Sequence, residues 1–262
     1  MRAPVTVRSG RDIAALVHEI GFLPFYSTPV PGFSLRDLTD PAIWISNDQS
    51  VNPWYYRQDV ALDDRIVYGK LFDGKMGFVD IDLFPDFVRV RRDGRDPREM
   101  LEAGFLKPVD LAVLDAIPHG ESRTEPLIKE DLIVEPKGIP AALARLQTAT
   151  FLYTASFEYK LTRGGRPYGW PLAAYMRPEE ELGRERVFPR PERTYEAARA
   201  ALLERVLAVV PDALERSPDG VRRLIEFAMG PKAKTTKRAA MTARTARKGK
   251  AEKTAPSSTE RK

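Results

Sequence analysis

The sequence predicts an α+β fold, and three patterns along the chain lead to this prediction. An amphipathic helix precedes a β-hairpin near the N-terminus, three short helices precede a long two-stranded ribbon near the middle, and further helices follow. The chain has 262 residues, of which 43% are hydrophobic. This length and composition are enough for one or two packed domains.

Residues 1–95 are expected to form an N-terminal α+β module. The segment SGRDIAALVHEIG has apolar residues at helical spacing, with Ser9 as its N-cap and Gly21 as its stop. Further on, two β-rich runs flank Asp73-Gly74, a dipeptide that strongly favours a tight hairpin turn. The run LFPDFVRVRRDGRD is then expected to lead out of the module through a turn.

Residues 96–177 are expected to form a second domain. The segments PVDLAVLDAI and SRTEPLIKEDLI predict two helices, and GIPAALARLQTATF predicts a third, with Pro140 in its first turn. The run FLYTASFEYKL, the break TRGGRP and the run YGWPLAAYM predict a two-stranded ribbon. Three short helices followed by such a ribbon are the element order of a winged helix, in which the ribbon is called the wing.

Residues 178–230 are expected to be a Pro-rich linker followed by two C-terminal helices, capped by Thr194 and Ser217. These helices either pack on the rest of the protein or provide a surface for a homo-oligomer. Residues 231–262 contain Lys, Ala, Thr and Arg with almost no large apolar residue. We expect this tail to be disordered, because it cannot bury enough surface to balance the entropy of ordering.

The positive charge of the chain is concentrated in this tail. The net charge of the whole chain is +5, but the tail has eleven Lys and Arg against two Glu and therefore carries +9 by itself. Residues 1–230 are left with −4. A tail of this kind favours nucleic acid as a partner, with an affinity that depends strongly on salt.

Several classes of protein are disfavoured by what the sequence lacks. It has no cysteine, which excludes disulfides and thiolate chemistry, and its two histidines, His18 and His119, do not have metal-ligand spacing. We therefore expect neither a metal nor a cofactor. There is no uninterrupted apolar stretch of about 18 residues and no apolar leader at the start, so we expect a cytoplasmic protein that does not bind membranes.

The third helix and the wing contain the candidate DNA contacts. In winged helices the third helix normally enters the major groove, and the wing touches the backbone or the minor groove. We expect the helix to turn Arg145 and Thr148 away from its apolar face, leaving a smooth surface suited to recognition of DNA shape. The candidate DNA-binding residues are Lys137, Arg145, Thr148, Lys160, Arg163 and Arg166.

Three of these features have less specific interpretations. Winged helices also mediate contacts between proteins, and a basic wing tip is often only a solvated turn. Gln147 can be a boundary residue that bridges a backbone group rather than a catalytic one. The aromatic residues Trp54, Tyr55 and Tyr56 can stack on an extruded or single-stranded base, or they can anchor the core and a loop.

Several phrases of the sequence together resemble those of one protein family. The phrases are IGFLPF, PGFSL, PWYYR, VYGKLFDGKMGFV, FPDFVRVRRDG, LARLQTATFLY and GGRPYGW. They resemble a group of small bacterial proteins related to the AlkZ DNA glycosylases, over roughly residues 12–176. The glycosylases themselves consist of tandem winged helices, excise alkylated, cationic purines and unhook interstrand crosslinks.

The resemblance implies a catalytic motif of Gln, an apolar residue, and then Gln or Asp, on a helix of a winged-helix domain. An alkylated base is already a good leaving group, so such a site mainly holds a water and stabilises charge on the sugar. The matching residues here are Gln147, Thr148 and Ala149, so only Gln147 is kept and Ala149 has no functional group. A carboxylate from elsewhere, such as Glu158, can take the missing place.

The sequence therefore predicts a winged-helix DNA-binding protein linked to alkylation or crosslink repair, with weak catalysis or none. One alternative is an active DNA glycosylase-like enzyme that uses Gln147. The other is a winged helix that binds proteins and has no role with nucleic acid.

Overall fold

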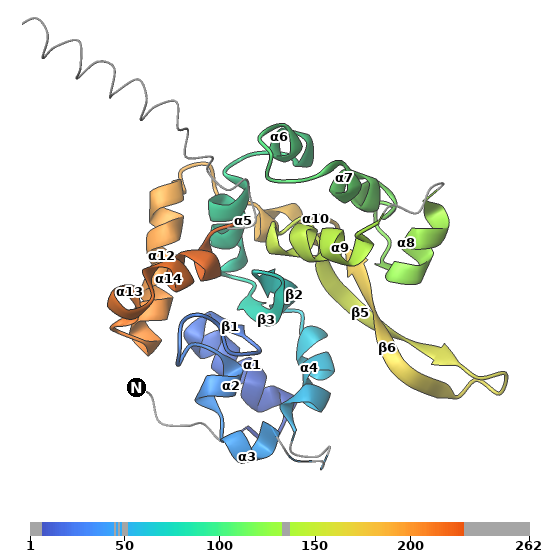
Figure 1. The fold of residues 1–262 in the computed structure, drawn as a ribbon, viewed down its shortest axis with the longest axis horizontal. Coiled ribbons are helices and arrows are strands. Elements are labelled where there is room, and N and C mark those ends of the chain that lie inside the picture. The colour runs from blue at the N-terminus through green and yellow to red at the C-terminus, as the bar shows by residue number, and fades with distance from the viewer. Residues whose placement is uncertain (1–6, 45, 47, 49–51, 133–136, 228–262) are drawn as a thin grey trace, which may run out of the picture. The chain divides into compact units, whose positions relative to one another are not determined.

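The computed structural model describes residues 7–44, 46, 48, 52–132 and 137–227. They form a mixed α+β structure with two small antiparallel sheets of three strands each (Figure 1), which confirms the predicted fold class. All of them fall within one compact unit that spans residues 1–230. The basic tail, residues 231–262, for which the sequence predicts disorder, lies outside the described residues.

The N-terminal helix is confirmed. Helix α1 (Gly10–Ile20) begins at Ser9, whose hydroxyl accepts a hydrogen bond from the Asp12 N–H, and it ends at Gly21 with a φ of 95°. Strand β1 (Phe22–Pro24) follows directly. The positive φ explains the glycine at the stop, because a side chain is strained in that conformation.

The predicted hairpin is also confirmed, and it forms the rest of the first sheet. Strands β2 (Ile66–Phe72) and β3 (Lys75–Asp80) pair antiparallel, and β3 also pairs with β1. The two residues of the turn, Asp73 and Gly74, have φ values of 51° and 76°. Two consecutive positive φ values are typical of the tight turns that match the twist of paired strands.

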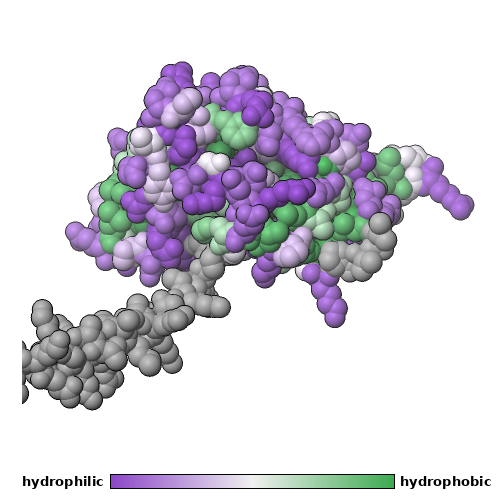
Figure 2. Space-filling model, turned by 90° about the horizontal axis from the view of Figure 1, so that it is seen from above, coloured by the Kyte–Doolittle hydropathy of each residue, from purple (hydrophilic) through white to green (hydrophobic). Residues whose placement is uncertain are grey.

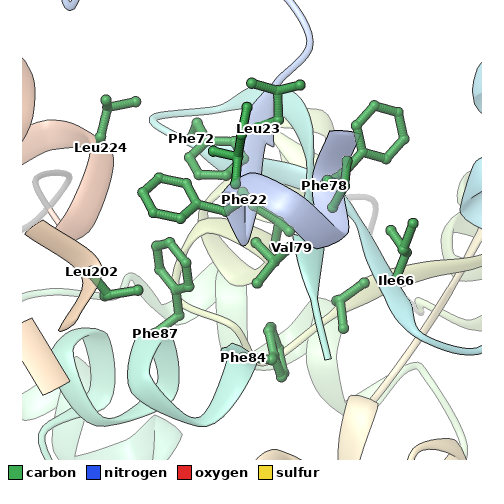
Figure 3. Packing of buried hydrophobic residues seen from close by; sticks show 14 of the residues in the cluster. Phe22, Leu23, Ile66, Phe72, Phe78, Val79, Phe84, Phe87, Leu202 and Leu224 are labelled. Atoms are coloured by element: carbon green, nitrogen blue, oxygen red, sulfur yellow. The ribbon is translucent and has the colours of Figure 1, made fainter. Parts of the chain in front are cut away.

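A phenylalanine-rich core lies beside this sheet. The ring of Phe22 is 5.8 Å from that of Phe72 and 5.0 Å from that of Phe87, centre to centre. Helices α12 (Tyr195–Val209) and α14 (Pro218–Ile225) add Leu202 and Leu224 to the same core (Figure 3). The two C-terminal helices thus pack on the rest of the protein, and a homo-oligomer through them remains a prediction.

The structure of residues 84–92 differs from the prediction, which was a turn. They form helix α5 (Phe84–Arg92), whose buried face includes Phe84, Phe87 and Val88. Arg91 is also buried, and its guanidinium donates hydrogen bonds to the carbonyls of Thr148, Leu224 and Ile225. The turn prediction was wrong because two consecutive arginines near the C-terminal end, Arg91 and Arg92, are buried by contacts with distant segments.

The middle of the chain contains the three predicted helices and the ribbon, together with one further helix and one short strand that were not predicted. In order, the elements are α6 (Pro97–Glu102), α7 (Pro108–Asp115), β4 (Arg123–Thr124), α8 (Glu125–Asp131), α9 (Ile139–Thr148), β5 (Tyr153–Leu161) and β6 (Pro167–Met176). The second sheet has the strand order β4-β6-β5. A second apolar core gathers side chains from α6, α7, α8 and α9, among them Met100, Val113 and Leu146.

The β5–β6 ribbon and its turn, residues 153–176, are called the wing below. The wing extends away from the helices (Figure 1), and its outermost end is hydrophilic (Figure 2). The strands pair antiparallel, with a register shift between Glu158 and Lys160. Residues 158–170 are all exposed, so this half of the wing has no buried face.

The remaining helices are short. They are α2 (Leu35–Leu38), α3 (Pro41–Trp44), α4 (Pro53–Ala61), α10 (Pro178–Glu181), α11 (Arg184–Val187) and α13 (Ala213–Arg216). The segment predicted as a Pro-rich linker therefore contains α10 and α11. Within the described residues, no helix combines the length and the apolar character that crossing a membrane requires.

Candidate functional site

Gln147 lies near the C-terminal end of α9 and is only 1% exposed. Its amide oxygen accepts hydrogen bonds from the Lys70 N–H at 3.0 Å and from the Thr154 hydroxyl at 3.4 Å. Its amide nitrogen donates to the Leu143 carbonyl at 2.9 Å. A Cβ on Gly69 would lie 2.7 Å from the amide oxygen, so β2 must have a glycine where it passes this side chain.

Thr148 holds the same strand from the next position of α9. Its hydroxyl donates to the Lys70 carbonyl or to the Ala144 carbonyl, each at 2.8 Å, and accepts from the Gly74 N–H at 3.2 Å. Together, Gln147 and Thr148 attach the β2–β3 hairpin to α9. Both side chains bond partly buried backbone groups of β2 and its turn, which is a structural role.

Arg145 forms a buried ion pair with Asp110 of α7. Its Nε lies 2.8 Å from Oδ2 of Asp110 and its Nη2 lies 2.5 Å from Oδ1, and the two side chains are 9% and 0% exposed. Two parallel hydrogen bonds between a guanidinium and a carboxylate are a strong arrangement. The charge of Arg145 is therefore already paired inside the protein.

The expected outward direction of Arg145 and Thr148 is wrong. Both are buried, and α9 exposes mainly Pro140 and Ala141. The reason is that α9 is covered on two sides, by the helices of its own core and by the β2–β3 hairpin. A helical wheel drawn from the apolar residues of α9 contains no information about the β2–β3 hairpin, which buries the second side of the helix.

The other candidate DNA-binding residues are exposed. Lys160, Arg163 and Arg166 lie on the outer half of the wing, and Lys137 directly precedes α9. Among the described residues, none of the three wing cations has a carboxylate within ion-pair distance. The wing thus brings three free positive charges together, while Arg145 and Thr148 stay apart from them inside the protein.

The wing also carries aromatic residues that the sequence analysis did not list as candidates. Tyr168 is 51% exposed and Trp170 is 66% exposed. Trp170 lies with its ring 6.5 Å from that of Trp54 on α4, and Tyr159 donates a hydrogen bond to Gln58 of the same helix. Aromatic residues directly after the Gly-Gly turn of a basic ribbon were the signal available in the sequence.

The aromatic segment 54–56 has mixed surroundings. The guanidinium of Arg57 lies 3.5 Å from the centre of the Trp54 ring, and Trp54 is partly buried among core residues. Tyr55 is 37% exposed. Burial raises the pKa of Tyr68 to about 12 despite the opposing effect of Arg57. Trp54 therefore serves as an anchor, and its ring contacts that of Trp170 on the wing.

The chemistry available around Gln147 is limited by its contacts. Ala149, two residues after Gln147, is the C-cap of α9, and its methyl group is fully buried. Glu158 lies on the exposed part of β5, whereas Gln147 is buried. In this arrangement the amide of Gln147 is used to position backbone, and a reacting water would have to displace one of its hydrogen bonds.

One comparison with known proteins shows the family of the chain, and no curated protein matches it. Among solved structures, the DNA glycosylase AlkZ of Streptomyces sahachiroi is similar, with 11% sequence identity and a TM-score of 0.43 over 88% of this chain and 58% of that one. The chain thus spans less than two thirds of that glycosylase. A sequence family described as "AlkZ related" matches residues 7–222. The chain belongs to this AlkZ-related family.

Proposed function

We propose that this protein binds DNA, and that the wing makes the main contact. The single observation that carries the proposal is the outer wing itself, where three cations without ion-pair partners among the described residues lie beside two exposed aromatic rings. Cations attract the phosphate backbone, and exposed aromatic rings can stack on bases. The family relationship supports DNA as the partner.

The element order supports a winged helix over residues 96–177. Helix α7 is followed by the short strand β4, then by α8, α9 and the two wing strands. The strand β4 pairs with β6 and not with β5, which places the wing's second strand in the centre of the sheet. The proposed boundaries leave residues 1–95 as the module that covers α9 and residues 178–230 as helices that close the first core.

In this proposal α9 does not enter the major groove as the third helix of a winged helix normally does. The β2–β3 hairpin occupies the side of α9 that Thr148 and Gln147 face. Lys137, just before α9, is the exposed candidate on the helix side. Arg145 and Thr148 act as positioning residues, since Arg145 ties α9 to α7 and Thr148 ties it to the β2–β3 hairpin, and the wing follows the end of α9.

A salt-series binding experiment tests the wing directly. The variant Lys160→Gln/Arg163→Gln/Arg166→Gln is compared with Arg11→Gln/Arg36→Gln/Arg98→Gln, which removes three exposed cations outside the wing. Residues 1–230 are used to exclude the tail, with fluorescence anisotropy on a short duplex. The wing variant should lower the affinity at least tenfold, about 1.4 kcal/mol. Its salt slope should fall by up to about 3.

Equal losses in the two triple variants would contradict a specific role of the wing. If binding disappears when residues 231–262 are removed, the folded part is not a DNA reader. In that case the exposed Leu161, Tyr168 and Trp170 would favour the alternative of a protein partner.

Activity as a glycosylase is the second candidate, and the family relationship favours testing it. The repair role is examined with duplex DNA that contains 7-methylguanine, by measuring release of the free base. Gln147→Ala should abolish release if Gln147 is catalytic. Thr154→Val is the matched control, because it removes one hydrogen-bond partner of Gln147 and leaves the amide in place. Release by both variants at the wild-type rate would show that Gln147 is purely structural.

A further inference from the structure

A cleft lined by arginines lies on a different part of the protein from the wing. A cavity of about 240 Å³ is bordered by the end of α5, the start of α6, and residues 177–188. A second cavity of about 160 Å³ adjoins it, because both are lined by Arg92, Gly94, Arg95 and Phe188. The two cavities together are called the arginine cleft below.

Three polar atoms of the arginine cleft are buried without a hydrogen-bond partner among the described residues. They are Nη1 of Arg177, Nε of Arg89 and Oε2 of Glu179. Arg177 is only 9% exposed. Buried polar groups are nearly always hydrogen-bonded in folded proteins, so two donors and one acceptor in the same cleft are available to a ligand.

The side chains of the cleft are held in place by other contacts. Arg92 is 4% exposed, and its Nε donates to the hydroxyl of Thr150 at 3.0 Å, while its guanidinium lies 4.2 Å from the centre of the Phe151 ring. Nη2 of Arg177 donates to the Leu114 carbonyl at 2.7 Å. Because these groups are already ordered, a ligand would not have to order them on binding.

The residues that line the cleft carry a net positive charge. Four arginines line it, against two carboxylates, Asp96 and Glu179, although two of the arginines also have a carboxylate just outside the lining: Arg95 lies 3.3 Å from Asp93, and Arg177 lies 3.8 Å from Glu180. The carboxylate of Asp96 caps α6 by accepting from the N–H groups of Arg98 and Glu99. Glu179 lies 3.9 Å from Nη2 of Arg92, which is beyond hydrogen-bond distance. The ligand should therefore be an anion that can also donate a hydrogen bond to the carboxylate of Glu179.

We propose that the arginine cleft binds a protonated phosphate group. A hydrogen phosphate in the larger cavity offers oxygen acceptors to the guanidinium groups of Arg92 and Arg177, and its O–H donates to Oε2 of Glu179, because all three side chains line that cavity. Sulfate has similar size and charge but carries no proton near neutral pH, so Glu179 would repel it. A phosphodiester of the DNA backbone lacks the O–H as well and is excluded for the same reason.

Two sources share this chemistry, namely inorganic phosphate and the terminal phosphomonoester of a nucleic acid or nucleotide. A phosphomonoester retains its O–H in part near neutral pH, because its second pKa is about 6. None of the proposed DNA-contacting residues lines the cleft. The inference therefore goes beyond the proposed DNA binding and does not depend on it.

The first experiment compares phosphate with sulfate. Isothermal titration calorimetry on the full chain at about pH 7 uses chloride to match the ionic strength. Phosphate should bind with one site per chain and at least tenfold more tightly than sulfate. Equal binding of the two anions, or no binding of either, would overturn the proposal.

Two variants and a control locate the site. Glu179→Gln removes the repelling charge and should abolish the preference for phosphate, mainly by raising the affinity for sulfate. Arg177→Gln, which removes a guanidinium proposed to bind the phosphate, should weaken phosphate at least fivefold. Arg98→Gln on the adjacent helix α6 does not line the cleft and should change nothing. An unchanged preference in Glu179→Gln would contradict the role of its carboxylate.

The last experiment distinguishes the two sources of the phosphate. Short oligonucleotides with and without a 5′-phosphate are titrated into the triple wing variant, so that wing binding is reduced to a minimum. A 5′-phosphate that competes with inorganic phosphate assigns the cleft to nucleic-acid ends. A 5′-phosphate without effect assigns it to the free ion. If the wing does not bind DNA, the competition between the 5′-phosphate and inorganic phosphate can still be measured, so the two sources are still distinguished.

Discussion

The end of α9 and the wing that follows it are adjacent in sequence but opposite in physical character. Arg145, Gln147 and Thr148 are buried, and each of them forms a hydrogen bond to a segment outside α9. Arg163 and Arg166 are exposed, without carboxylate partners among the described residues. The comparison shows that one continuous helix–ribbon segment is divided into a part that holds the fold together and a part that is free to bind.

The buried ion pair should give the largest effect on stability. Arg145→Met leaves the Asp110 carboxylate buried without its partner, which costs about 3–5 kcal/mol. The measurement is urea unfolding followed by circular dichroism. Adding Asp110→Asn should recover part of the loss, because the amide does not need a counter-charge. A loss in the single variant of less than about 1 kcal/mol would mean that Arg145 is not tied to α7 in solution.

The contact between β2 and α9 should give the next largest effect. Gly69→Ala places a methyl group against the Gln147 amide and should cost about 1–3 kcal/mol. The clash disappears if Gln147 is shortened, so Gly69→Ala and Gln147→Ala together should cost less than their sum. Gly164→Ala in the wing turn, where the nearest atom is 4.0 Å away, is the control and should be almost neutral. Strict additivity would contradict the contact.

The two hairpin turns provide a matched pair of glycines. Gly74 and Gly165 have φ values of 76° and 75°, and a Cβ on either would meet nothing within 4 Å. Alanine at Gly74 should cost about 1–2 kcal/mol, because the left-handed conformation is strained with a side chain. Gly165→Ala should cost less, since the wing turn is bonded only within itself and can relax. Thermal unfolding of both variants measures the difference between the two losses of stability. If the hydrogen bond between Thr148 and Gly74 is absent, the two losses should be equal.

The smallest effect on stability should come from the wing cations. Arg163→Gln and Arg166→Gln should each change the free energy of unfolding by no more than about 0.5 kcal/mol. Their DNA affinity should nevertheless fall, as proposed above. A clear loss of stability in either variant would show that the wing is part of the fold, and it would remove the contrast with α9.

The sequence predicted those elements whose signals are local. Ser9 and Gly21 mark the ends of α1, Asp73-Gly74 marks the first hairpin, and the apolar spacing of α9 marks that helix. Helix α5 was missed, although Phe84, Phe87 and Val88 have helical spacing. Its arginines suggested an exposed turn, and their burial depends on segments far away in the chain.

The candidate site was predicted only in part, for the same physical reason. The exposed wing cations could be recognised because nothing covers them. The burial of Gln147 depends on Lys70, 77 residues earlier, and a helical wheel does not include such a partner. Arg145 was misplaced because an arginine on a helix is usually solvated, and its carboxylate partner on α7 has no sequence signal of its own.

The position of Arg91 between three carbonyls has a consequence for the synthesis of the protein. Two of these carbonyls belong to Leu224 and Ile225, more than 130 residues after Arg91. The first core is therefore incomplete until the last described helix has left the ribosome, although its sheet is made within the first third of the chain. Contacts of such long sequence separation slow folding and expose apolar surface meanwhile. The N-terminal sheet would thus be the first part made and among the last to be finished.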